Sequence, residues 1–212
     1  MNIDIFISYI SILSPLIGVI VFLKYKQKLT TNSLFKLITG LLLFWFIADF
    51  IGLIMAINGV NNHYLINIVG VVEAILIVII FYKILFKFKT TVMITGVVFI
   101  IMFTIYTFVI QSYETFANYG RGMECLVFVF FSFMFFFQLY KYETDIFIEG
   151  NPLFLVVIAF FIYFSGAFFS YIMFFLMEGF SENFIFTWSL HNVLNIVKNI
   201  ILAVAIWKQV VK

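Results

Sequence analysis

Five side chains that can carry charge lie inside long apolar stretches of this sequence. Asp49, Glu73 and Glu124 each interrupt one apolar stretch, and His191 and Lys198 lie together in the last one. Ionisable groups at membrane depth are rare because hydrocarbon solvates charge poorly, and they generally mark a functional site with a partner. Carboxylates that face an ammonium and an imidazole could bind a charged small molecule or an ion.

The last apolar stretch carries its polar residues on one face. At 100° per residue, the α-helical period, His191, Asn195 and Lys198 share a face, and Asn192 lies at the edge of a polar arc of about 120°. The opposite face is apolar. Because lipid cannot hydrogen-bond to polar side chains, this polar face must turn toward the protein interior.

The same groups lie at a common depth. With a rise of 1.5 Å per residue, His191, Asp49, Glu73, Asn195 and Lys198 fall between about 8 and 18 Å below the outer boundary of the membrane. Tyrosine hydroxyls on the preceding segment could reach this layer. We therefore expect an interior polar pocket whose ligand-binding residues are Lys198, Glu73, Asp49, His191, Asn195, Asn192 and Tyr163.

These groups also need partners. An unpaired lysine at this depth costs about 2.5–3.5 kcal/mol on insertion scales, so we expect Lys198 to lie within salt-bridge or single-water reach of Glu73 or Asp49. Glu124 lies near a helix start, where it can pair with Arg121 one turn away. The alternative reading of the whole set is a structural polar network that joins helices.

The composition places the chain in a membrane. Of its 212 residues, 65% are hydrophobic and 10% are charged, and the mean hydropathy is +1.20, whereas soluble domains have about 25% charged residues. We expect an all-α, multi-pass protein of the inner or plasma membrane that forms one seven-helix domain, residues 1–212, with no soluble domain. The apolar segments are about as long as a bilayer is thick, and they lie near 5–23, 35–57, 64–86, 91–110, 117–140, 153–177 and 185–207.

The distribution of basic residues predicts how the bundle is oriented in the membrane. Ten of the 12 lysines and arginines fall at one end of the expected helices: Lys24, Lys26, Lys28, Lys36, Lys83, Lys87, Lys89, Lys141, Lys208 and Lys212. The opposite loops hold His63, Arg121, Asp4, Glu114, Glu178 and Glu182. Because basic loops stay in the cytoplasm, the N-terminus should be outside and the C-terminus cytoplasmic.

Two further features concern the helices themselves. Pro15 lies inside the first segment and should kink it. The triplet at 67–69 is repeated at 195–197, and 44–48 resembles 161–165. These matches are compatible with a 3+1+3 parallel repeat, an arrangement known in transporters, and equally with chance matches in a sequence rich in Phe and Ile.

Catalytic motifs are absent. The sequence has no H-E-x-x-H and no G-x-S-x-G, the signatures of zinc peptidases and serine hydrolases. The single cysteine, Cys125, cannot form a disulfide framework or a thiolate metal site. The lysine clusters, which are interleaved with aromatic residues, are more typical of topology signals and headgroup contacts than of nucleic-acid sites. We expect no catalysis, no cofactor, no metal and no nucleic-acid partner.

The layout resembles that of the rhodopsins, with seven helices, an external N-terminus and Lys198 in the middle of the last helix. The resemblance implies a retinal Schiff base on Lys198 with Glu73 as its counterion. The sequence departs from the microbial pattern at Leu194, where those proteins have an acidic residue, and it lacks their aromatic–tyrosine–aspartate pattern between Val71 and Tyr82.

The preferred hypothesis is a non-enzymatic sensor or receptor. A small molecule or ion would enter from outside, and the last two helices would pass a shift to a cytoplasmic signalling protein. A small-solute or ion transporter is the main alternative, because such proteins bind their substrates near mid-membrane. A retinal protein and an intramembrane enzyme are less favoured.

Overall fold

The computed structural model describes residues 3–29, 31–111, 118–142, 150–176 and 181–211, and over these ranges the chain is helical without strands. Seven helical spans are long and apolar enough to cross a membrane. The elements are α1 (Ile3–Leu13), α2 (Pro15–Lys24), α3 (Lys26–Leu29), α4 (Ser33–Ile57), α5 (His63–Ile84), α6 (Lys89–Ile105), η1 (Tyr106–Ile110), α7 (Asn118–Tyr142), α8 (Pro152–Leu176) and α9 (Ser181–Val211). The prediction of an all-α bundle with seven spans is confirmed, and α9 extends beyond the expected 185–207 at both ends.

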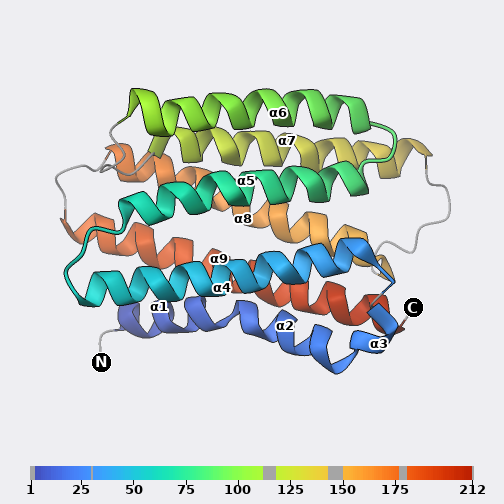
Figure 1. Ribbon diagram of the computed structural model, residues 1–212, viewed down its shortest axis with the longest axis horizontal. Coiled ribbons are helices and arrows are strands. Elements are labelled where there is room, and N and C mark those ends of the chain that lie inside the picture. Colours follow the sequence, from blue (N-terminus) through green and yellow to red (C-terminus); the bar gives the residue numbers. More distant parts are fainter. Residues whose placement is uncertain (1–2, 30, 112–117, 143–149, 177–180, 212) are drawn as a thin grey trace.

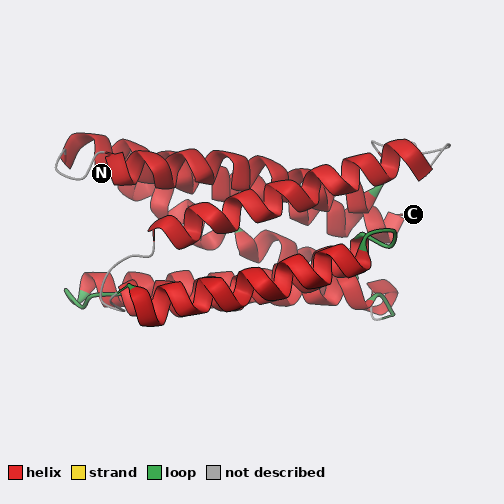
Figure 2. Ribbon diagram, turned by 90° about the horizontal axis from the view of Figure 1, so that it is seen from above, coloured by secondary structure: helices red, strands yellow, loops and turns green. Residues whose placement is uncertain are grey.

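The spans run side by side along one long axis (Figures 1 and 2). Each span packs against the next one in sequence, and α9 closes the ring by packing along both α1 and α2. α5 also contacts α7, so α6 lies at the edge of the bundle (Figure 1). This order surrounds an interior that α1, α4, α5, α7, α8 and α9 can all reach.

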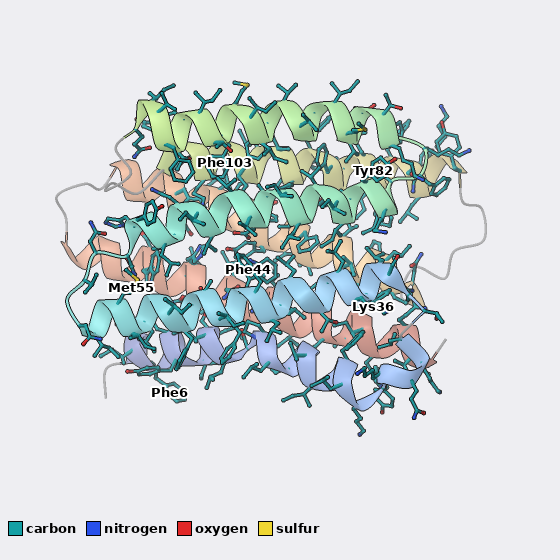
Figure 3. All side chains as sticks on the ribbon, viewed as in Figure 1. Phe6, Lys36, Phe44, Met55, Tyr82 and Phe103 are labelled. Carbon is teal, nitrogen blue, oxygen red and sulfur yellow. The ribbon has the colours of Figure 1, made fainter. Side chains whose placement is uncertain are left out.

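The two ends of the bundle differ in charge. α2, α5, α7 and α9 end at one side of Figure 1, and α4 and α6 begin there. Lys36 and Tyr82 lie at this end and Met55 lies at the other (Figure 3). We call the first the lysine-rich end. Lys89 lies 5.5 Å from the ring centre of Tyr82, within the range of a cation–π contact.

Phenylalanines fill the lysine-rich half of the interior. The Phe81 and Phe131 ring centres are 5.5 Å apart, and those of Phe128 and Phe164 are 4.8 Å apart. Ring pairs at these separations attract each other beyond the area they bury. Such packing matters in a membrane, where lipid tails are as apolar as the side chains and burial alone does not drive helices together. Outward-facing side chains such as Phe6, 48% exposed, point away from the bundle (Figure 3).

The first span is divided where proline was expected to disturb it. α1 ends at Leu13 and α2 begins at Pro15. Proline has no N–H to donate to the carbonyl one turn back, which here belongs to Ser11. The hydroxyl of Ser14 donates to that carbonyl instead, at 2.7 Å. The internal repeat and the orientation of the bundle stay predictions.

Candidate functional site

A buried ion cluster joins α5 to α7. Arg121 Nη1 donates to Glu73 Oε2 at 2.9 Å and to Glu124 Oε2 at 2.6 Å. The three residues are 8%, 4% and 1% exposed, respectively. Glu124 lies three residues after Arg121 on α7, so the two side chains meet on one helix face. Two carboxylates therefore share one guanidinium, and the cluster keeps a formal excess of one negative charge.

Arg121 corrects part of the sequence interpretation. Its assignment to the loops opposite the lysine-rich end is wrong, because α7 begins at Asn118 and carries Arg121 into the interior. Its predicted pairing with Glu124 is confirmed. Asp4 also lies on a helix, α1, instead of in a loop. Glu114, Glu178 and the side chain of Glu182 lie outside the described residues.

The guanidinium of Arg121 rests against the backbone of α5 at Gly70. A Cβ atom added to Gly70 would lie 2.9 Å from Arg121 Cζ, closer than carbon atoms normally approach. Gly70 lies one turn before Glu73 on the same helix face, so this glycine lets the guanidinium reach Glu73.

Substitution of Gly70 by alanine should therefore destabilise the protein. The guanidinium cannot move away without lengthening its two ion pairs, and overpacking of this kind costs about 1–3 kcal/mol. The matched control is Gly40→Ala in α4, where an added Cβ meets nothing within 4 Å. Thermal unfolding in detergent should show a lower midpoint for the Gly70 variant only. Equal midpoints for both variants would show that Arg121 is not tightly held.

Lys198 is buried in the middle of α9 and is 1% exposed. Its Nζ lies 3.4 Å from the ring centre of Trp45 and 4.0 Å from that of Tyr163. Such cation–π contacts contribute about 0.5–2 kcal/mol. Among the described residues Lys198 forms no salt bridge, and Glu73 is paired with Arg121 instead. The expected direct salt bridge to Glu73 or Asp49 is thus not formed, and reach through one water stays a prediction.

Asp49 is the second charged group in this region without a direct partner. It lies four residues after Trp45 on the same face of α4, one turn along the helix. Within the described part of the chain it forms neither a salt bridge nor a side-chain hydrogen bond. Asp49 and Lys198 attract each other over a longer distance, and Lys198 is attracted more strongly by Glu73, which is already paired with Arg121. A carboxylate and an ammonium are thus close enough to attract each other but do not touch.

His191 lies among aromatic rings about two turns before Lys198 on α9. Its Nε2 is 3.4 Å from the hydroxyl of Tyr163, and its ring stacks on that of Trp188 with the centres 5.6 Å apart. Its Nδ1 is buried without a hydrogen-bond partner. Because buried polar atoms are nearly always hydrogen-bonded, this nitrogen is a further unsatisfied group beside Tyr163.

A ladder of small polar side chains joins α9 to the first span. The amides of Asn192, Asn195 and Asn199 donate to hydroxyls at 3.0, 2.9 and 2.8 Å, and the acceptors are Ser8, Ser11 and Ser14. At the end of the ladder Ser189 donates to Asp4 at 2.7 Å. The pairs keep a nearly constant separation in sequence, as they must between two parallel helices. Asn192 and Asn195 thus take part in a polar network that joins α9 to α1, which was the alternative to a ligand-binding role.

A cavity of about 270 Å³ lies in the half of the bundle away from the lysine-rich end. All the predicted ligand-binding residues line it: Lys198, Glu73, Asp49, His191, Asn195, Asn192 and Tyr163. Tyr171, one of the tyrosines of the preceding segment whose hydroxyl was expected to reach this layer, also lines the cavity. Other lining residues were not predicted as ligand-binding residues from the sequence: Arg121, Trp45, Trp188, Ser8 and Ser11. The i, i+3 spacing of the serines and the position of Arg121 one turn inside the fifth segment were the signals that could have identified them.

The site combines two kinds of charged group. Arg121, Glu73 and Glu124 are paired with one another, whereas Lys198 and Asp49 form no salt bridge with a described residue. In the described part of the chain no three His, Cys, Asp or Glu side chains gather as metal ligands do. The site can thus attract both an anionic and a cationic group into one cavity. Comparison of the chain with protein-family models, with curated proteins and with solved structures finds no match.

Proposed function

We propose that this protein is a membrane receptor that binds a small polar molecule in the cavity between α1, α4, α5, α7, α8 and α9. The observation that carries the proposal is that Lys198 and Asp49 line this cavity without a salt bridge to any described residue. An unpaired charge at membrane depth costs about 2.5–3.5 kcal/mol on insertion scales. A ligand that pairs with both groups would offset this cost, so binding would be favourable.

The packing of the bundle supports access from one side. Between the cavity and the lysine-rich end, the interior is filled by buried phenylalanine and aliphatic side chains, such as Phe81, Phe160 and Ile206. If the lysine-rich end is cytoplasmic, as basic residues favour, the cavity lies in the outer half of the membrane. A ligand would then enter from outside and find no open path inward.

Helix α9 is the element that would carry a signal. It lines the cavity with His191, Asn195 and Lys198 and then continues to Val211 at the lysine-rich end. A ligand that pulls Lys198 away from the rings of Trp45 and Tyr163 changes how α9 packs on α4 and α8. A cytoplasmic signalling protein in contact with the end of α9 would detect that change.

A transporter is the second candidate, and one observation favours it. The first span is divided at Ser14, about one helical turn from Ser11, which lines the cavity. Transporters commonly bind substrates beside discontinuous helices near mid-membrane. Saturable binding without gradient-driven uptake into proteoliposomes would favour the receptor, and concentrative uptake would favour the transporter.

Filling the cavity with an apolar side chain should abolish binding. Gly52 of α4 lines the cavity, and an added Cβ would lie 3.8 Å from the nearest atom, an ordinary contact. Gly52→Leu should thus occupy the space without unfolding the protein. The matched control is Gly40→Leu on the same helix, where an added Cβ meets nothing within 4 Å.

The measurement is a thermal-shift screen of the purified protein with amino acids, amines, organic acids and simple cations. At least one compound should raise the unfolding midpoint of the wild type and of Gly40→Leu but not that of Gly52→Leu. If no compound shifts the wild type, or if Gly52→Leu responds like the control, the cavity is not a ligand site.

A further inference from the structure

The charged groups that line the cavity are not equivalent. Glu73 and Arg121 satisfy each other, and Glu124 adds a second carboxylate to the same guanidinium. This cluster has no positive charge to spare for a ligand. Among the described lining residues that leaves Lys198 as the one cation without an ion pair and Asp49 as the one carboxylate without an ion pair.

A ligand with only one sign of charge fits this pair poorly. An anion beside Lys198 would face Asp49 and the negative ion cluster, and a cation beside Asp49 would face Lys198. Like charges at short distance in a medium of low dielectric constant repel strongly. A molecule that carries both signs on neighbouring atoms avoids both conflicts and leaves the total charge of the site unchanged.

We propose that the ligand is an α-amino acid whose carboxylate pairs with Lys198 and whose ammonium pairs with Asp49, an inference that rests on the binding function proposed above. In an α-amino acid one carbon carries both charged groups. Such a molecule can therefore bridge two side chains that attract each other electrostatically without touching. Both contacts are charge-assisted hydrogen bonds, which are the strong ones in proteins.

The rest of the lining defines the side chain of that amino acid. The lining residues of α4 and α5 include the aliphatic side chains of Leu53, Leu65 and Val69. The lining residues of α8 and α9 include the aromatic side chains of Tyr171 and Trp188. The volume of about 270 Å³ lies just below the range of about 300–1,000 Å³ typical of drug-sized ligands. The ligand class is therefore an amino acid with an apolar side chain.

The test uses two matched sets of probes on the purified full-length protein. One set is phenylalanine, phenethylamine and 3-phenylpropanoate, and the other is leucine, 3-methylbutylamine and 4-methylpentanoate. In each set the second compound lacks the carboxylate and the third lacks the ammonium. At least one amino acid should bind, and removal of either charged group should weaken its binding about ten- to hundredfold, the effect expected for one charge-assisted hydrogen bond.

Two variants distinguish the two contacts. Asp49→Asn should weaken amino-acid binding and tighten binding of the matched acid, because it removes the carboxylate that repels that acid. Lys198→Met should weaken amino-acid binding and tighten binding of the matched amine, because it removes the ammonium that repels that amine. Lys36→Met, a change of an exposed lysine at the lysine-rich end, is the control that should alter nothing. If either variant fails to fold, the affinities of the wild type for an amino acid, its matched amine and its matched acid are sufficient to test whether both charged groups are recognised.

Several outcomes would overturn the inference. An amine or an acid that binds as tightly as its amino acid would show that the missing group is not recognised. If none of the six probes binds while another compound in the screen does, the ligand class is wrong but the receptor function stands. If nothing in the screen binds at all, the receptor function fails together with this inference.

Discussion

Replacement of Arg121 by leucine should destabilise the protein by about 3–5 kcal/mol, because it leaves two buried carboxylates without their common partner. Glu73 and Glu124 are 4% and 1% exposed, so neither can recover the lost interaction from bulk water. Equilibrium unfolding in mixed micelles would measure the change, and the variant should also accumulate poorly in the membrane.

The control for this prediction neutralises the whole cluster. Arg121→Leu combined with Glu73→Gln and Glu124→Gln should recover most of the lost stability, since neutralising a buried ion cluster costs far less than removing one partner. A single Arg121→Leu variant that unfolds like the wild type would mean that the cluster is hydrated or differently arranged.

Loss of both unpaired charges should affect binding instead of folding. In the double variant Lys198→Met with Asp49→Asn, no described salt bridge is broken, because neither residue takes part in one. Its free energy of unfolding should stay within about 2 kcal/mol of the wild type. The cost of burying two charges that form no salt bridge is removed, and this gain offsets the loss of the cation–π contacts of Lys198 with Trp45 and Tyr163. Its affinity for phenylalanine and leucine should fall roughly hundredfold or more, because two charge-assisted contacts are lost together.

Isothermal titration and thermal unfolding of the same preparation would separate the two effects. A double variant that unfolds readily would show that Lys198 and Asp49 are structural after all. A stable double variant that still binds either amino acid with wild-type affinity would place the ligand elsewhere.

The sequence predicts the spans well because their signal is local. A run of apolar residues long enough for a bilayer identifies each helix by itself, and Pro15 marks the division of the first span because proline lacks the required N–H. The polar face of α9 follows in the same way from the helical period. The predicted ligand-binding residues line one cavity because lipid forces every polar face inward.

The pairing within the site could not be predicted in the same way. Helical periodicity gives the face of each residue on its own helix, but not how that helix is rotated against its neighbours. Glu73 could have paired with Lys198 or with Arg121, and the choice depends on the close approach of α7 to α5 at Gly70. The partners of Asn192 and Asn195 are small uncharged serines, which give little signal in a hydropathy pattern.

Cryo-electron microscopy of the protein purified in native lipid would reveal what surrounds Lys198 Nζ, the atom on which the proposed binding site depends. Arg121 should contact both Glu73 and Glu124, and Lys198 and Asp49 should face an open cavity or hold a small molecule between them. A direct salt bridge between Lys198 and Asp49, with apolar side chains filling the space, would rule out the proposed site.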